Sequence, residues 1–214
     1  MATLAQLIAE EKPIAEIAAY LDALSFPDTK AETHALDRNQ QRKLYQLAAH
    51  SLALTFEDLT PSSVPARTEI IHHGRNTLPL PGPFRNFEKR MCKPDSGGEK
   101  AFGYNEGMTR RFIGPGYFVA IPTAGHDGWP ERGPIVVDYF QVPQEPVVTG
   151  WPKVVANTVG LQFFVFNKTR DFMRKVSDRV SIGAAYKVEK ALDHYFVLVR
   201  ESPTGTRLAG PEAK

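Results

Sequence analysis

Residues 100–121, KAFGYNEGMTRRFIGPGYFVAI, show the pattern that decides the fold. Short runs of aromatic and β-branched residues alternate here with glycine and proline, and the same pattern continues to residue 201. Such runs are typical of β-strands joined by turns. The pattern predicts a β-rich body that could enclose a ligand cavity, bury a plain core, or carry an active site at its rim.

Strands are predicted throughout the second half of the chain, and one helix interrupts them. That helix begins at Thr169 and carries Phe172, Met173 and Val176 as an apolar stripe. Because strands mostly follow strands, we expect antiparallel pairing in a β sandwich or a partly open barrel. The predicted strands are residues 67–73, 84–92, 100–104, 110–113, 117–121, 135–142, 161–166, 180–186 and 194–200.

The front of the chain is predicted to be helical. Apolar residues recur at helical spacings over residues 4–24, and the interruption at Lys12-Pro13 favours two short helices over one. Thr3 has the capping-box spacing to a glutamine three residues later, and so does Asp37, where a further helix is expected to start. Helices this short need tertiary partners, so their apolar faces should pack on each other, on the body, or on another chain.

The change of pattern predicts three regions. Pro27 and Asp28 should close the first helical pair, and the polar, proline-containing stretch 55–65 should connect elements of different type. We therefore expect a helical N-terminal segment over residues 1–60, a β-rich body over 61–202 and a flexible tail over 203–214. The fold class is α+β, with short helices packed on the mostly antiparallel body.

Composition excludes several classes of protein. The chain of 214 residues is 42% hydrophobic and 23% charged, which is ordinary for a globular protein, and its net charge is only +2. A small net charge without an RNA-binding motif argues against nucleic-acid binding. No apolar stretch is long enough for a membrane span. Cys92 is the single cysteine, so a reducing compartment, the cytoplasm, is expected.

The first group of candidate site residues consists of histidines and an aspartate that could perform acid-base catalysis. His72 and His73 end a predicted strand, and His126-Asp127 lie in a later loop. Adjacent strand residues point to opposite faces, so only one of His72 and His73 can face a given cavity. The chain has no HxH, HExxH or CxxC spacing, so no metal site is predicted.

The second group consists of candidate ligand-binding residues. Tyr104, Arg111 and Tyr117 combine apolar area with polar tips, a mixture that orients small ligands. Asp138 lies between apolar neighbours in a predicted strand, where an inward position would desolvate it.

The leading prediction is therefore binding of a small, partly apolar ligand in the β body. One alternative is an enzyme with a His/Asp acid-base or metal site, and another is an interaction module or homo-oligomer formed through the N-terminal helices. No cofactor is indicated by any motif.

Overall fold

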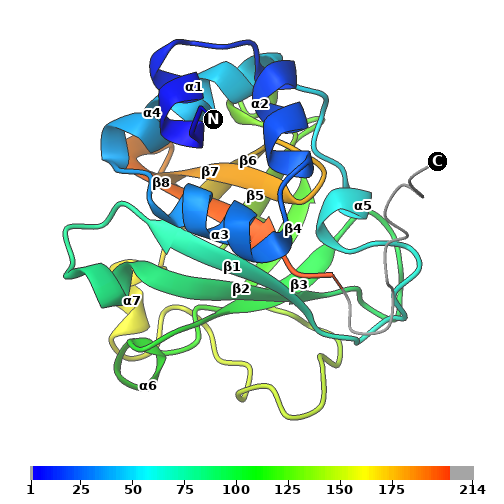
Figure 1. Cartoon of the computed structure of the whole chain (residues 1–214). Coiled ribbons are helices and arrows are strands. Elements are labelled where there is room, and N and C mark those ends of the chain that lie inside the picture. The colour runs from blue at the N-terminus through cyan, green and yellow to red at the C-terminus, as the bar shows by residue number, and fades with distance from the viewer. Residues whose placement is uncertain (1, 203–214) are drawn as a thin grey trace.

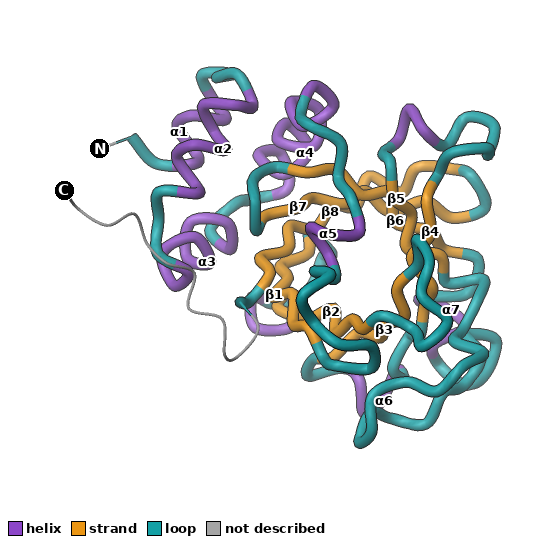
Figure 2. Tube along the Cα trace, turned by 90° about the vertical axis from the view of Figure 1, so that its right-hand side faces the viewer, coloured by secondary structure: helices purple, strands orange, loops and turns teal. Residues whose placement is uncertain are grey.

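The computed structural model describes residues 2–202, and a closed barrel of eight antiparallel strands lies at their centre (Figure 1). Each strand pairs with its neighbour in the chain, and the first strand pairs with the last to close the ring. Figure 2 shows the strands as a ring with helices on its outside. The strands are β1 (Ile70–Asn76), β2 (Asn86–Cys92), β3 (Ala101–Glu106), β4 (Phe118–Pro122), β5 (Ile135–Asp138), β6 (Thr169–Lys175), β7 (Val180–Lys187) and β8 (Lys190–Arg200).

The predicted α+β class with an antiparallel barrel is confirmed, but the barrel is neither a sandwich nor partly open. The correction comes from the pairing of β1 with β8, which runs from His72 opposite Arg200 to Asn76 opposite Phe196. This pairing leaves no free edge in the ring. The predicted flexible tail, residues 203–214, lies outside the described residues.

Aromatic rings fill the barrel by lying over glycines of neighbouring strands. A Cβ atom added to Gly183 would come within 2.2 Å of the Phe196 ring, so only glycine leaves room for this ring. A small residue facing a large one is a common way to fill a small barrel. The three pairs are Gly74 with Phe87, Gly103 with Phe118, and Gly183 with Phe196.

Four N-terminal helices cover the outer face of the barrel over β7, β8 and β1 (Figure 1). Their apolar side chains, including Leu4, Ile17 and Leu44, pack with Ile182 and Val197 of the barrel wall in one buried cluster. The capping boxes at Thr3 and Asp37 are present as predicted. The helices are α1 (Leu4–Ala9), α2 (Ile14–Asp22), α3 (Phe26–His34) and α4 (Arg38–Leu47).

Two details of the front half differ from the sequence prediction. Pro27 and Asp28 do not close a helical pair but lie in the first turn of α3, which Ser25 caps. Proline is well tolerated there because the first-turn amides have no partner within the helix. The stretch 55–65 contains a short helix, α5 (Phe56–Leu59).

The predicted helix at Thr169 is wrong, because this segment forms β6. Met173 faces the barrel interior, while Phe172 faces outward against the rings of Trp129 and Tyr186. A strand covered on both sides is apolar at adjacent positions, and in sequence this resembles the stripe of a short helix.

The predicted strands at 110–113 and 161–166 are also wrong, since these segments form the short helices α6 (Arg110–Ile113) and α7 (Gln162–Val165). The continuous apolar run at α7 suggested a strand covered on both faces. Most of its apolar side chains are instead exposed, and that of Phe164 is 72% accessible. Apolar sequence is thus a poor guide to burial at this end of the barrel. Across residues 2–202, none of the helices has the length and apolar character required to traverse a lipid bilayer.

Candidate functional site

A groove of about 390 Å³ lies on the outside of the barrel, between α3 and strands β1 and β2. We call it the α3 groove. The groove runs from the outer face of β1 to the end of the barrel at which β2 begins and β3 ends. It is lined by Lys30, His34, His73, Pro83, Asn86, Phe87, Glu88, Arg90, Glu106, Gly107 and Met108.

One face of α3 forms a wall of this groove. Phe26, Lys30 and His34 are spaced four residues apart, so they share a helix face. The Phe26 ring meets the His73 ring edge-on at 5.6 Å, and Lys30 Nζ lies 3.0 Å from His73 Nδ1. His34 lies one turn beyond Lys30. The helix therefore places the imidazole of His34 beside that of His73, which comes from β1, at the same groove.

The contacts of His73 define its tautomer. The Lys30 ammonium has only hydrogens to offer, so Nδ1 of His73 accepts. The hydrogen of the ring then resides on Nε2, which donates to Glu201 Oε2 at 3.0 Å. Glu88 Oε1 lies 3.7 Å from Nδ1. His73 is thus oriented from both sides and presents a fixed polar edge to the groove.

His34 differs because its Nε2 atom is buried and has no hydrogen-bond partner among the described residues. Burial lowers the pKa of His34 to about 4, and the positive charges of Lys30 and Arg75 act in the same direction, while a backbone contact to His73 opposes them. The ring is therefore neutral at pH 7. A neutral imidazole nitrogen is able to accept or donate one hydrogen bond, so His34 keeps an unpaired polar atom buried beside the groove.

The other charged side chains of the groove are paired with each other or with close neighbours. Arg90 contacts Glu88 at 2.8 Å and Glu69 at 3.3 Å. Burial alone would raise the pKa of Glu106, but hydrogen bonds from Arg110 and the Gly107 amide lower it. The charges of the groove largely cancel, so it has no strong preference for an anion or a cation.

Directly inside the barrel, Lys89, Asn105, Tyr139 and Asp171 form a buried polar group that we call the lysine cluster. Lys89 Nζ donates to Asp171 Oδ2 at 3.0 Å, to Asn105 Oδ1 at 3.1 Å and to the Tyr139 hydroxyl. These three contacts use all three hydrogens of an ammonium group. Asn105 Nδ2 donates to the Gly116 carbonyl at 2.9 Å, which fixes the orientation of the amide.

Aromatic rings surround the buried ammonium. The rings of Phe87, Phe118, Tyr139 and Phe196 have centroids between 4.9 and 5.7 Å from Lys89 Nζ. Burial lowers the pKa of Lys89, and the Asp171 carboxylate opposes this shift. Burial also raises the pKa of Tyr139 well above its usual value. All donors of the cluster are thus directed at protein acceptors, so it supports the barrel from within.

Phe87 connects the two features. Its ring belongs to the aromatic shell around Lys89 on the inner face of β2, and the same residue contributes to the lining of the α3 groove. A ligand in the groove would therefore lie next to the strand segment that carries the shell.

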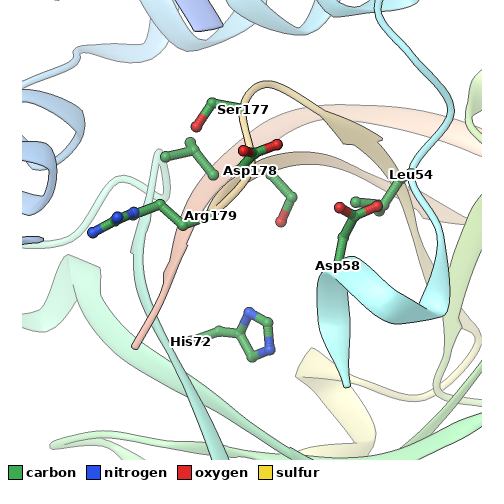
Figure 3. A pocket seen from close by; sticks show the side chains of 8 residues that line it. Leu54, Asp58, His72, Ser177, Asp178 and Arg179 are labelled. Carbon is green, nitrogen blue, oxygen red and sulfur yellow. The ribbon is translucent and has the colours of Figure 1, made fainter. Parts of the chain in front are cut away.

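A second hollow lies between α5 and the turn that joins β6 to β7 (Figure 3). Figure 3 shows Asp58, Asp178 and the His72 ring on three different sides of it. Its volume, about 0 Å³, leaves no space for a water molecule. It therefore offers no room for a ligand.

The predicted ligand-binding residues lie on the outside of the barrel. The rings of Tyr104 and Tyr117 are 5.6 Å apart, and both are buried under the connection between β5 and β6, where Tyr104 also meets Trp151. Arg111 is exposed on α6. Asp138 is buried 3.4 Å from Arg170, on the opposite face from the interior residue Tyr139. The structure brings Tyr104 and Tyr117 together but not the set of four.

The predicted acid-base residues have separate partners. His72 is buried in the barrel, where its Nε2 lies 2.9 Å from the Leu59 carbonyl, and burial lowers its pKa to about 3. His73 faces outward into the groove. His126 stacks on Trp129 at 4.1 Å, and Asp127 is exposed beside it. Within residues 2–202, no group of three or more His, Cys, Asp or Glu side chains is placed to hold a metal ion.

Sequence reasoning missed His34 and the whole lysine cluster. The sequence contains a signal for the cluster at Phe87, Lys89 and Met91. These alternate residues point to the same face of the strand, so the charged Lys89 shares a face with two large apolar residues. In the strand that holds Asp138, the side chains that point inward are those of Val137 and Tyr139, so Tyr139 and not Asp138 reaches the cluster. His34 carried no signal, because it is the end of a polar helix that only the fold places beside His73.

The fold and site define a closed, eight-stranded meander barrel with a helical cover and a groove beneath one covering helix. Comparison with known protein families, curated proteins and solved structures finds no match. The functional conclusion therefore depends on the geometry of the α3 groove.

Proposed function

We propose that the protein binds a small, partly apolar ligand in the α3 groove. The main support is the groove itself, because about 390 Å³ is within the range of roughly 300 to 1,000 Å³ that small-molecule sites occupy. Its lining is also mixed. Phe87, Pro83 and Met108 supply apolar area at one end, and His34 and His73 supply polar atoms at the other.

The chemistry of the lining limits the class of ligand. Arg90 and Glu88 neutralise each other, and Lys30 is engaged with His73. A fully charged ligand would have to displace one of these pairs. The unused Nε2 of His34 favours a ligand with one neutral hydrogen-bonding group, such as a hydroxyl or a carbonyl, attached to an apolar body.

The test is native mass spectrometry of the full chain together with a thermal-shift screen of lipids, tetrapyrroles and small metabolites. A ligand at about 100 times its Kd should stabilise the fold by about 2.7 kcal/mol. For a chain of this size, that is a rise in Tm of about 5–10 °C. Absence of both a bound species and any rise in Tm across the screen would contradict the proposal.

Gly107→Leu tests the location. A Cβ atom at Gly107 meets only ordinary contacts, the nearest being the Asn86 carbonyl oxygen at 3.5 Å, so the larger side chain should fill the groove without unfolding the protein. Gly82→Leu is the matched control, because a Cβ atom there has nothing within 4 Å. Gly107→Leu should remove the ligand-induced rise in Tm, and Gly82→Leu should keep it. Equal responses from the two variants would place the ligand elsewhere.

His34→Phe tests the polar contact. The substitution keeps an aromatic ring and removes the unpartnered Nε2, so Tm without ligand should stay constant or rise. Affinity for the ligand should fall by about tenfold, the value of one hydrogen bond to a buried group. Unchanged affinity would mean that His34 does not contact the ligand.

We also propose that the protein is located in the cytoplasm. Cys92, the single cysteine, is buried, and burial raises the pKa of its thiol to about 12. A chain that uses no disulfide is suited to a reducing compartment. Fractionation of cells that express the full chain would test the location, and recovery from the extracellular fraction would contradict it.

A further inference from the structure

One end of the barrel carries nearly all of the exposed large apolar side chains. In an antiparallel meander, the connections β1–β2, β3–β4, β5–β6 and β7–β8 all begin and end at the same end of the barrel. The middle of the long β5–β6 connection runs along the outside to the other end, where Glu145 bonds to Ser96 and Lys100. Of the twelve exposed large hydrophobic residues among those described, eleven lie in these four connections or at the first residues of β8. We call this surface the apolar mouth. The twelfth residue, Leu52, lies between α4 and α5.

The exposure is large and is concentrated on two neighbouring helices. Phe112 on α6 is 78% exposed, Phe164 on α7 is 72% exposed, and Leu161, just before α7, is 58% exposed. The helices α6 and α7 lie at the same end of the barrel (Figure 1) and touch, because Gly114 at the end of α6 packs against Gln162. An apolar surface of this kind usually marks an interaction site.

The outward position of these side chains is fixed by the fold. Gln162 accepts a hydrogen bond from the Gly116 amide and donates to the Ala156 carbonyl, so this face of α7 is held inward. Phe166 packs on Gly116 and stacks on the Tyr139 ring at 5.2 Å. With these two anchors in place, the other side of the turn, which carries Phe164, must face outward.

The apolar mouth is also basic. Its four connections contain five Lys or Arg residues and two Asp or Glu residues. The three connections at the opposite end contain four basic and five acidic residues. Exposed aromatic and aliphatic side chains with basic residues among them are the features of a surface that inserts shallowly into a lipid interface.

We propose that the apolar mouth docks on the surface of an anionic lipid membrane. Phe112, Leu161 and Phe164 insert at the boundary between headgroups and acyl chains, and Arg111 contacts the lipid phosphates. The charge complementarity favours this occupant over a second copy of the chain, whose apolar mouth would bring an equal excess of positive charge. The proposal does not depend on a ligand in the α3 groove.

Co-sedimentation of the full chain with lipid vesicles tests the proposal. Binding should be strong to vesicles of phosphatidylcholine mixed with phosphatidylglycerol, weak to phosphatidylcholine alone, and should fall as salt is added. Arg111→Gln should lower binding to the anionic vesicles by about fivefold. Binding that ignores lipid charge, or no binding to either vesicle, would overturn the proposal.

Phe164→Ser should weaken binding by about tenfold, because an inserted phenylalanine loses its contact with the acyl region. Leu52→Ser is the matched control, since Leu52 is 80% exposed but lies outside the apolar mouth. Both variants should keep the Tm of the parent chain. Equal loss of binding in the two variants would refute docking through the mouth.

A Phe164→Trp variant reports on insertion directly. Its fluorescence should shift to shorter wavelength with anionic vesicles and be quenched by lipids with brominated acyl chains. Vesicle binding without quenching would place the contact elsewhere and overturn the proposal. Light scattering tests the alternative of a second copy. If the parent chain is a dimer that Phe164→Ser dissociates, and the parent chain does not bind vesicles, the apolar mouth is an interface between two copies. The His34→Phe variant, whose substitution lies on α3 and outside the apolar mouth, should bind vesicles normally, which separates this surface from the α3 groove.

Discussion

Removal of either charge of the buried Lys89–Asp171 pair should destabilise the barrel, and removal of both should not. Lys89 is 1% exposed and Asp171 is 5% exposed, so neither group can recover its hydration when its partner is lost. Breaking a buried ion pair by removing one partner costs about 3–5 kcal/mol. For a chain of this length, Lys89→Met or Asp171→Leu should therefore lower Tm by about 10 °C.

The double variant shows whether the single variants lose stability because a charge is left unpaired or because packing is lost. With both charges gone, Asn105 Nδ2 and the Tyr139 hydroxyl still bond to each other at 3.1 Å, so no polar group of the lysine cluster is left without a partner. The stability of Lys89→Met/Asp171→Leu should then lie within about 1 kcal/mol of the parent, because buried pairs can be replaced by apolar residues of similar volume.

The assay is urea and thermal unfolding followed by circular dichroism for the parent, both single variants and the double variant. Lys153→Met, at an exposed lysine, is the control for the substitution itself and should leave the Tm unchanged. The reasoning is refuted if each single variant loses less than about 1 kcal/mol, or if the two losses add in the double variant.

Two further predictions concern the interior. Because burial lowers the pKa of His72 to about 3, the unfolded chain binds a proton below pH 6.5 that the folded chain excludes, so stability should fall from pH 6.5 towards the folded pKa, by about 1.4 kcal/mol per pH unit. His72→Gln should lower the slope of this part of the stability profile, measured by urea unfolding, and the slope that remains should include the contribution of His34, whose pKa burial lowers to about 4. Gly183→Ala should lower Tm by several degrees, because the new Cβ would lie 2.2 Å from the Phe196 ring and overpacking costs about 1–3 kcal/mol. An unchanged Tm in this variant would show that the ring can move aside.

Local chemistry made much of the fold predictable. Thr3 and Asp37 cap helices where the spacing to Gln6 and Gln40 indicated, and the break at Lys12-Pro13 separates two helices. Most strands were also located, because alternation and turn residues act over a few positions. Closure of the barrel was not predictable in this way, since it depends on the pairing of β1 with β8 across the length of the body.

The sequence predictions of secondary structure are wrong where the burial of a segment does not match its apolar character. The apolar run at α7 is exposed and helical, whereas Thr169–Lys175 forms a strand buried on both faces. The candidate site shows the same limit. His34 and His73 meet only because α3 lies across β1, and Lys89 meets Asp171 only across the barrel, so no short-range pattern reports either contact.

The seam between β1 and β8 has a consequence for synthesis. Seven of the strand pairings join chain neighbours and can form as hairpins soon after the residues leave the ribosome, but the eighth must wait for β8. Until then, the nascent sheet has two open edges able to pair with other chains. The helices α3 and α4, which emerge before all of the strands, pack on β8 more than on any other strand and lack this partner in the interval. Aggregation during translation should therefore be most sensitive to changes in β8, whose arrival completes the ring.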